Sequence, residues 1–336
     1  ERISRETLAG AARSLASGSE GVTVFNPLNW ERESPLRLPA AAGAKCQALP
    51  GHNEVLCQLD LPPLSATGFK PASEARVAPR TIALPPVIET RHYRARLDPA
   101  TGALLSLRLK SSDREILGGP ANVIVAERPK KPVGPGDQMV ERPGRDRLTD
   151  SSATAPKLTV STGPLATVVE AESAFLGGGT LRRQVVFYHD HPRIEFETEL
   201  NDIPDRTVVL AGFPLAAAVR EVRRGVPYGF SHAAWSETNA ALHGVAKGIT
   251  PAVRWSHYQM EGCGVALLDQ GLSGREINGN TPVIYLLNAV EKYRGYPNAW
   301  LSGAGRQVLR YALVAHPGDF AGARIPQAAW EFTQPP

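Results

Sequence analysis

Residues 182–201, with the sequence RRQVVFYHDHPRIEFETELN, constrain the fold most, because they encode two β-strands and the turn between them. On each side of a break, apolar and polar side chains alternate with a period of two, which is typical of strands. The break is the segment 189–192. Proline has no amide hydrogen to give to a strand ladder, so Pro192 belongs in a turn or at the start of a strand. We therefore predict a pair of strands joined by a turn.

The remaining chain reads as more of the same all-β fold. Its 336 residues include 31 Gly and 29 Pro, which interrupt the sequence at short intervals and favour many short strands over long helices. Helical spacing is found only at 4–16, which we interpret as the end of a preceding helical region. Further strands are expected at 93–97, 104–107, 208–213, 264–268, 283–287 and 308–314, and a long surface excursion without periodicity at 128–157.

Changes in composition along the chain predict four parts. Residues 1–20 are the end of the helical linker region, and 21–70 form a small β-sandwich module. Residues 71–86 carry four of the prolines and suit an extended linker, and 87–336 form a large β-domain. Because the chain opens on Glu1 and not on methionine, we expect it to be a piece of a longer protein.

Charge and hydropathy argue against two classes of partner. Lys and Arg number 37 against 33 Asp and Glu, and this net charge of +4 is too small and too scattered to predict nucleic-acid binding. The sequence has no run of 18 apolar residues, so we predict no membrane span.

Three cysteines allow one internal disulfide. If residues 50–53 form a four-residue hairpin loop, Cys46 falls directly opposite Cys57, at a separation that a disulfide can bridge. The alternative is two buried free thiols, and the choice depends on the redox compartment. Neither the spacing nor the neighbours of Cys263 suggest a zinc site or a catalytic thiol.

Two clusters in the central stretch resemble catalytic groups but are better explained by structure. His189 and His191 could bind a metal, but no third ligand is close in sequence and Pro192 explains the cluster as a turn. The ladder Glu195, Glu197 and Glu199 offers carboxylates for glycoside hydrolysis. Side chains on one strand face point in parallel and cannot flank a bond from opposite sides, so we predict a solvated outer face. No metal ligand and no catalytic residue is assigned in this chain.

The loop-rich passage 225–257 collects aromatic and hydrogen-bonding side chains of the kind that a sugar-binding surface uses. The candidates within it are Tyr228, His232, Trp235, Arg254, Trp255 and His257. A second candidate loop, 271–276, adds Arg275 and Glu276.

Several segments resemble glycoside hydrolase family 38, the α-mannosidases, in the order in which that family has them. They are VTVFNPLNWERE at 22–33, LPPLSATGF at 61–69, IETRHYRARLDPATGALLSL at 88–107, the central stretch, VPYG at 226–229, GCGVALLDQGLSG at 262–274 and YALVAHPGDF at 311–320. Each segment is short, but together they are spread along nearly the whole chain, from residue 22 to residue 320.

The resemblance implies an architecture and a division of labour. It implies a small β-sandwich followed by a large supersandwich similar to galactose mutarotase. It also implies an amino-terminal catalytic barrel, absent from this sequence, that holds zinc and an aspartate nucleophile. This chain would then need no cofactor. It would pack on the missing catalytic domain and lend residues to the rim of the mannoside cleft. The family's lysine-tyrosine-glycine turn is replaced here by GLSGRE at 271–276.

Two other functions fit the same residues. The chain could act alone as a carbohydrate-binding or aldose-mutarotase-like protein, using histidine and glutamate as acid and base. It could also be a purely structural module that supports oligomerisation, such as a homo-oligomer of the parent enzyme.

Overall fold

The fold is given by a computed structural model that describes residues 22–39, 46–69, 77–130, 145–234, 251–289 and 302–334, with five isolated residues before them. Two compact units are present. The small unit comprises 1–81, 161–166 and 334–336, and the large unit comprises 82–160 and 167–333. Of the helix predicted at 4–16, residues 6, 7, 10, 11 and 14 are described and are helical, whereas its other residues and residues 71–76 of the predicted linker lie outside the described residues.

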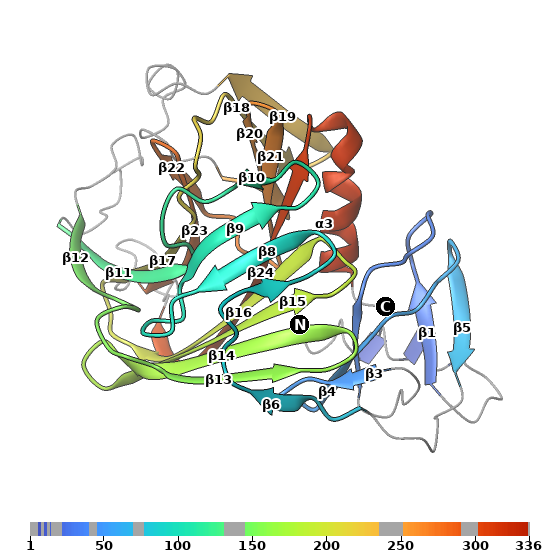
Figure 1. The fold of residues 1–336 in the computed structure, drawn as a ribbon, viewed down its shortest axis with the longest axis horizontal. Coiled ribbons are helices and arrows are strands. Elements are labelled where there is room, and N and C mark those ends of the chain that lie inside the picture. The colour runs from blue at the N-terminus through green and yellow to red at the C-terminus, as the bar shows by residue number, and fades with distance from the viewer. Residues whose placement is uncertain are drawn as a thin grey trace. The chain divides into compact units, whose positions relative to one another are not determined.

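Two short sheets form the small unit (Figure 1). β1 (Val22–Asn26) pairs with β5 (Ser65–Phe69), and β4 (Glu54–Cys57) lies between β2 (Leu36–Pro39) and β3 (Cys46–Ala48). Their apolar side chains make one small core, which is built of Val24, Leu36, Leu38, Cys46, Val55, Cys57 and Leu61. The side chain of Gln47 also ties 161–166 into this unit, because its amide accepts from and donates to the backbone of Ala166.

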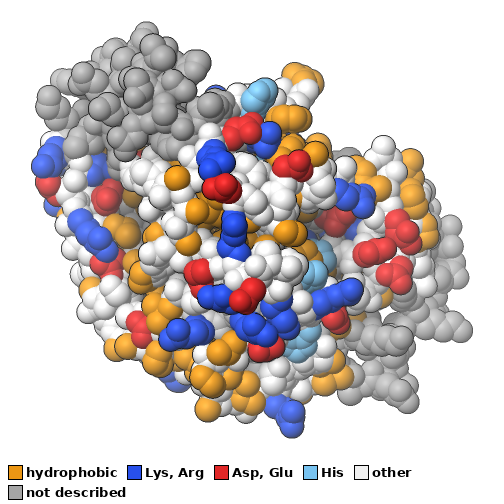
Figure 2. Space-filling model, turned by 45° about the horizontal axis from the view of Figure 1, so that its top comes forward, with side chains coloured by type: hydrophobic (Ala, Val, Ile, Leu, Met, Phe, Trp, Pro, Cys, Tyr) orange, Lys and Arg blue, Asp and Glu red, His pale blue; other side chains and the backbone are white. Residues whose placement is uncertain are grey.

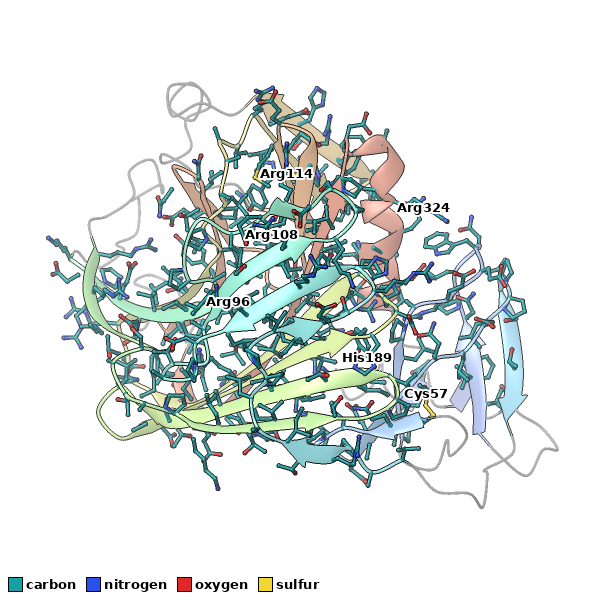
Figure 3. All side chains as sticks on the ribbon, in the orientation of Figure 1. Cys57, Arg96, Arg108, Arg114, His189 and Arg324 are labelled. Carbon is teal, nitrogen blue, oxygen red and sulfur yellow. A yellow bond between two sulfur atoms is a disulfide. The ribbon has the colours of Figure 1, made fainter. Side chains whose placement is uncertain are left out.

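A disulfide closes the β3–β4 hairpin of the small unit. Cys46 lies opposite Cys57 in the strand register, which confirms the register predicted from the four-residue loop. The two Cα atoms are 4.4 Å apart, and the sulfurs are bonded (Figure 3). Both residues are buried in the small core, so the disulfide cross-links the interior of this core.

Three sheets form the large unit. The first has the order β10-β9-β8-β7 and the second the order β12-β11-β17-β23-β22. The third runs β19-β18-β20-β21-β24-β16-β15-β14-β13, and all its residues except 161, 162 and 166 belong to the large unit. The strands of the first two sheets are β7 (Ile88–Glu89), β8 (Tyr93–Leu97), β9 (Leu104–Leu109), β10 (Arg114–Glu115), β11 (Val123–Pro129), β12 (Arg145–Asp150), β17 (Thr207–Gly212), β22 (Arg275–Asn278) and β23 (Thr281–Ala289).

Long strands and close antiparallel pairing characterise the third sheet. Its strands are β13 (Lys157–Thr162), β14 (Ala166–Phe175), β15 (Gly179–Tyr188), β16 (Arg193–Ile203), β18 (Glu221–Val226), β19 (Gly229–Ala234), β20 (Trp255–Met260), β21 (Cys263–Asp269) and β24 (Gly303–Pro317). β6 (Arg80–Ile82) crosses the boundary between the units at Thr81. The predicted all-β fold with a small and a large β-rich part is confirmed.

β15 and β16 are the two strands predicted from residues 182–201. Their register pairs Val185 with Phe196 and Phe187 with Ile194, so the apolar faces coincide as the period of two requires. Phe196 stacks on Tyr311 of β24 with ring centroids 5.4 Å apart, which places this hairpin in the main core. The segment 189–192 is the predicted turn.

β24 and the helix α3 (Ile325–Thr333) organise the carboxyl-terminal part of the large unit (Figure 1). β24 pairs with β16 on one side and β21 on the other. α3 follows a short 3-10 turn, η1 (Ala321–Ala323), and buries Ile325, Ala329 and Phe332 against the sheet that contains β20 and β21. This helix is an addition to the sequence prediction, although its apolar residues recur at helical spacing.

Two other segments are more regular than predicted. β12 occupies part of the excursion expected at 128–157 and pairs with β11. The passage expected to be loop-rich contains the β18–β19 hairpin, while 235–250 lie outside the described residues. Among the helices that the structure describes, none is both long and apolar enough to cross a membrane.

Candidate functional site

An open cleft of about 990 Å³ lies on the large unit where the third sheet ends at β18 and β19. Its walls come from these two strands, from the β20–β21 turn and from the segment after β24. The lining residues that bear on its chemistry are Glu221, Arg223, Phe230, His232, Asp319 and Phe320. Of the residues predicted from sequence, His232 lies in this lining.

One row across the sheet connects the cleft to the interior. Arg223 is paired in register with His232 on one side and with His257 on the other, so the three side chains share one face. His232 is exposed and Arg223 is half-buried, whereas His257 is fully buried. Of the two predicted histidines, only His232 can therefore meet a ligand directly.

His257 forms a buried pair with His316 of β24. Their Nε2 atoms are 2.9 Å apart, and the rings stack with centroids at 5.1 Å. His316 Nδ1 lies 3.0 Å from the carbonyl oxygen of Pro317, which can only accept, so His316 carries its proton on Nδ1. His316 Nε2 is then an acceptor and His257 Nε2 the donor, which leaves His257 Nδ1 as a buried acceptor without a partner.

Both imidazoles of the pair are held neutral. Burial, together with the neighbouring His316 and Arg223, lowers the pKa of His257 to about 3. Burial also lowers the pKa of His316, although the Pro317 carbonyl and Asp319 oppose the shift. A buried and neutral pair suits a structural role and does not supply the accessible acid that an aldose-mutarotase-like reaction would need.

Trp255, Arg254 and Tyr228 occupy three different environments. Trp255 is buried beneath the cleft and stacks on Phe320 with centroids 5.5 Å apart, so it supports the lining without belonging to it. The guanidinium carbon of Arg254 lies 3.9 Å from the ring centroid of Trp330 on α3. Tyr228 is fully exposed at the tip of the β18–β19 hairpin. Trp235 lies outside the described residues.

Arg275 is buried inside the large unit and does not reach a rim. Its Nε donates to the Ser256 hydroxyl at 3.2 Å and its Nη1 to the Gly274 carbonyl at 3.0 Å. Its Nη2 is paired with the carboxylate of Asp269, which is also buried. The guanidinium therefore stabilises the 269–275 turn from within.

Glu276 is also fully buried, in a second internal network. Its Oε2 accepts from Arg145 at 2.9 Å and from the Tyr285 hydroxyl at 2.6 Å, and its Oε1 accepts from Asn278 at 2.6 Å. Burial and the charge of Glu276 together raise the pKa of Tyr285 to about 12, although Arg145 opposes the shift. The structure thus removes both Arg275 and Glu276 from the surface on which the sequence placed them.

The glutamate ladder of β16 corrects another prediction. Glu195 and Glu197 are buried, whereas the sequence predicted a solvated face. Arg193 pairs with Glu195 at 2.8 Å and Arg310 with Glu197 at 2.7 Å. Arg193 is itself covered, because its guanidinium carbon lies 5.4 Å from the ring centroid of Phe332 on α3. A helix that covers this face, together with arginines that neutralise it, explains the burial.

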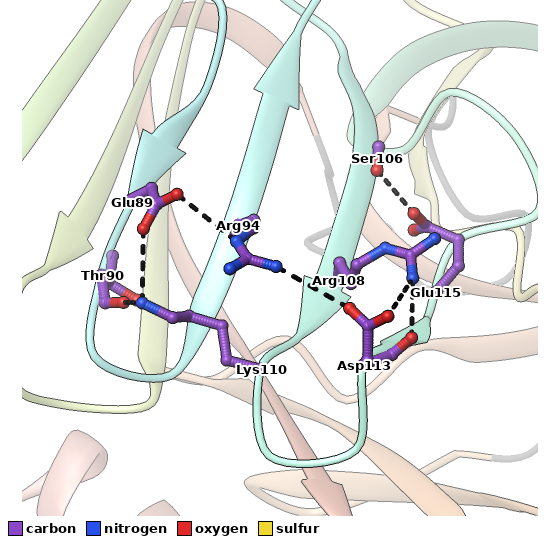
Figure 4. Close-up of polar contacts among 8 residues, drawn as sticks. All are labelled: Glu89, Thr90, Arg94, Ser106, Arg108, Lys110, Asp113 and Glu115. Carbon is purple, nitrogen blue, oxygen red and sulfur yellow. Dashed lines mark hydrogen bonds and ion pairs between the residues drawn. The ribbon is translucent and has the colours of Figure 1, made fainter.

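The outer face of the β7–β10 sheet carries a charged network of a different kind (Figure 4). Arg94 lies directly opposite Arg108 in register, and Asp113 lies within 3.8 Å of the first and 3.2 Å of the second. Glu89 pairs with Arg94 and Lys110. These pairs are well exposed, so each contributes at most about 1 kcal/mol. The mixture of signs, visible as interspersed blue and red in Figure 2, suits a solvated face.

The part of the chain that the structure describes holds no group of three or more His, Cys, Asp or Glu side chains that could bind a metal ion. Within these described ranges the side chains therefore do not fit a zinc site, and we derive no zinc chemistry for them. Cys263 is buried, and its sulfur lies 3.6 Å from Nη1 of Arg114.

Four residues of this region were missed in the sequence: Arg223, Phe230, His316 and Phe320. Arg223 and Phe230 lie in the short strands β18 and β19, whose sequences, EVRRGV and GFSHAA, show no regular alternation of apolar and polar residues. His316 lies 59 residues after His257 of β20, and Phe320 follows it, so sequence spacing cannot show that they converge with this strand.

Comparison with known proteins shows what the chain resembles. Residues 88–291 match the family described as "Glycosyl hydrolases family 38 C-terminal domain". Alpha-mannosidase 2C1 of Homo sapiens is 27% identical over 98% of this chain, and the match covers 31% of the human protein; the Mus musculus protein is 26% identical over the same shares. The chain thus spans about a third of the length of these relatives.

A solved structure supports the fold. The crystal structure of an alpha-mannosidase from Enterococcus faecalis superimposes with a TM-score of 0.64 at 11% identity, over 95% of this chain and 41% of that one. At this identity the likeness concerns the fold alone.

Proposed function

Since the chain belongs to glycosyl hydrolase family 38 and forms the non-catalytic C-terminal part of an α-mannosidase-like protein, we propose that the whole protein hydrolyses α-mannosides. In this proposal the described β-domains pack on a catalytic domain encoded elsewhere in the protein. That domain supplies the nucleophile, the acid and a bound zinc ion. The β-domains supply contacts to the carbohydrate.

The observation that carries the proposal is the pattern of coverage. The human relative matches 98% of this chain, but the match covers only 31% of the relative, and the family match is to a C-terminal domain. Retaining glycosidases need two carboxyl groups about 5 Å apart on opposite sides of the scissile bond. Glu195, Glu197 and Glu276 instead lie in internal ion pairs, which supports placing catalysis in the remainder of the protein.

Hydrolysis of a nitrophenyl α-mannoside tests the proposal. We expect the full-length protein to release nitrophenol, to lose this activity when zinc is chelated and to regain it when zinc is restored. The chain described above, expressed alone, should release none. Full-length protein without α-mannosidase activity would contradict the proposal, and so would chelation-resistant hydrolysis by the isolated chain.

A further inference from the structure

The cleft between β18, β19 and the β20–β21 turn has the size and construction of a small-ligand site. Ligand pockets typically enclose roughly 300–1,000 Å³ and combine an apolar or aromatic wall with a few polar groups. The cleft measures about 990 Å³ and contains both features. Its edges are fixed before any ligand arrives, since Gly318 donates its amide to the Gly262 carbonyl at 2.9 Å, and Gln259 Nε2 donates to the Gly318 carbonyl at 3.0 Å.

Phe230 gives the cleft an aromatic wall. It is 49% exposed, although it sits on an ordered strand, so a large part of its ring is free for a ligand. Trp255 supports the ring at 6.0 Å and Phe320 at 5.5 Å between centroids. The ring is therefore held in place from behind. The C–H face of a pyranose packs well on a rigid aromatic surface of this kind, because little side-chain entropy is lost on binding.

Arg223 gives the cleft an oriented hydrogen-bond donor. Its Nη2 is 2.9 Å from Glu221 Oε2, and its guanidinium carbon lies 4.8 Å from the ring centroid of Phe320. These two contacts fix the direction of the remaining N–H groups. Donor and carboxylate acceptor thus lie side by side, an arrangement that suits a hydroxyl group, which both donates and accepts.

The charge of the lining selects against anions. Arg220 and Arg223 face three carboxylates, Glu221, Glu261 and Asp319, which gives a formal charge of −1 with His232 neutral. Arg220 is occupied by an ion pair with Glu261 at 2.7 Å. A phosphate or carboxylate ligand would meet this excess of acid, whereas a neutral polyol would not.

The buried histidine pair keeps the floor of the cleft rigid and uncharged. The rings of His257 and Phe320 make an edge-type contact with centroids 5.1 Å apart, so the histidine pair lies behind the aromatic wall. His257 acts here as a positioning residue through Phe320.

We infer that this cleft binds a neutral pyranoside, with Phe230 stacking on the sugar ring and the Arg223–Glu221 pair binding its hydroxyl groups. The site is formed by this chain alone, so binding does not require the catalytic domain. Only the choice of a mannoside as first probe rests on the proposed function.

Saturation-transfer NMR titration of the isolated chain tests the inference, with methyl α-D-mannopyranoside and methyl α-D-glucopyranoside as probes. We expect saturable transfer from the protein to at least one of them. Phe230→Ala should weaken that binding about three- to tenfold, because about half of a Phe side chain loses its contact with the ligand. Phe230→Trp should preserve binding. Leu148→Ala removes an apolar side chain of similar exposure, 37%, on β12 away from the cleft lining, and should leave binding unchanged.

Three outcomes would overturn the inference: no saturable binding of either probe by correctly folded chain, equal affinity in Phe230→Ala, or tighter binding of mannose 6-phosphate than of the neutral mannoside. The test is separate from the hydrolysis assay. Hydrolysis by the full-length protein without binding by this chain would refute the cleft alone. Binding by this chain without hydrolysis would refute only the proposed activity.

Discussion

Gly264 of β21 is the position where a single methyl group should disturb the large unit most clearly. A Cβ atom built there would lie 2.4 Å from Nε2 of His257, 2.5 Å from Nε2 of His316 and 2.8 Å from its Cε1. Displacing the rings is costly, because both histidines are buried, they stack on each other, and His257 also packs on Phe320. Glycine at this position thus makes the histidine pair possible.

The expected cost of Gly264→Ala follows from three contributions. Overpacking a buried site costs about 1–3 kcal/mol. Separating the pair leaves a buried donor and a buried acceptor unsatisfied, which costs about 1–3 kcal/mol more. Alanine also lowers the conformational entropy of the unfolded chain, and this effect stabilises the folded state by about 0.4–1 kcal/mol. We therefore expect the free energy of unfolding to fall by roughly 3 kcal/mol.

Urea unfolding followed by near-ultraviolet circular dichroism measures this loss. For a unit of this size it should lower the midpoint by about 1 M. Gly229→Ala is the matched control: Gly229 is a glycine of β19 in the same sheet, and a Cβ there would meet nothing within 4 Å. Combining Gly264→Ala with His316→Ala should reduce the penalty, because the two changes act on one contact. An unchanged midpoint in Gly264→Ala would refute this account of the histidine pair.

Three further predictions follow from buried groups. Replacing Cys46 and Cys57 with Ala should destabilise the small unit by about 3 kcal/mol, because the bond closes a loop with a sequence separation of 11; equal melting with and without reductant would contradict this. The pKa of His257 is about 3 when folded against 6.5 when unfolded, so its stabilising contribution is complete above about pH 6.5. The contribution of His257 to the free energy of unfolding should fall by about 1.4 kcal/mol per pH unit as the pH decreases toward 3. In His257→Gln, the free energy of unfolding measured at several pH values should depend less steeply on pH. Arg275→Met should cost about 3–5 kcal/mol in thermal unfolding, because it leaves the Asp269 carboxylate buried without its ion pair; a cost below about 1 kcal/mol would refute that role.

The sequence predicted those parts of the fold in which the alternation of apolar and polar residues matches the buried and exposed faces of the strands. Residues 182–201 lie in the predicted pair of strands, β15 and β16, because apolar alternation and Pro192 act on the same segment. The hairpin register that places Cys46 opposite Cys57 followed from loop length alone. Strand pattern could not reveal that Arg193 and Arg310 neutralise Glu195 and Glu197, or that Phe332 of α3 lies over Arg193, so both glutamates were wrongly assigned to solvent.

The candidate site was less predictable because it depends on contacts between distant strands. Arg275 and Glu276 look like surface residues in the sequence, but Asp269 and Arg145 neutralise them in the interior. His232 was found, because aromatic and polar residues cluster around it in sequence. Phe230 acquires its role only when Phe320, 90 positions later, packs behind it.

The central position of β24 has a consequence for how this protein is made. β24 lies between β16 and β21, although it is the last strand of the sheet in sequence. On the ribosome, about a hundred further residues are synthesised after β16 before its second neighbour, β24, begins. During this time the unpaired edge of β16 can pair with other nascent chains. A premature stop before residue 303 would leave two separate half-sheets with unsatisfied edges. Such truncations should aggregate during translation and should burden chaperones far more than a lost terminal strand would in a sheet whose strands follow their order in sequence.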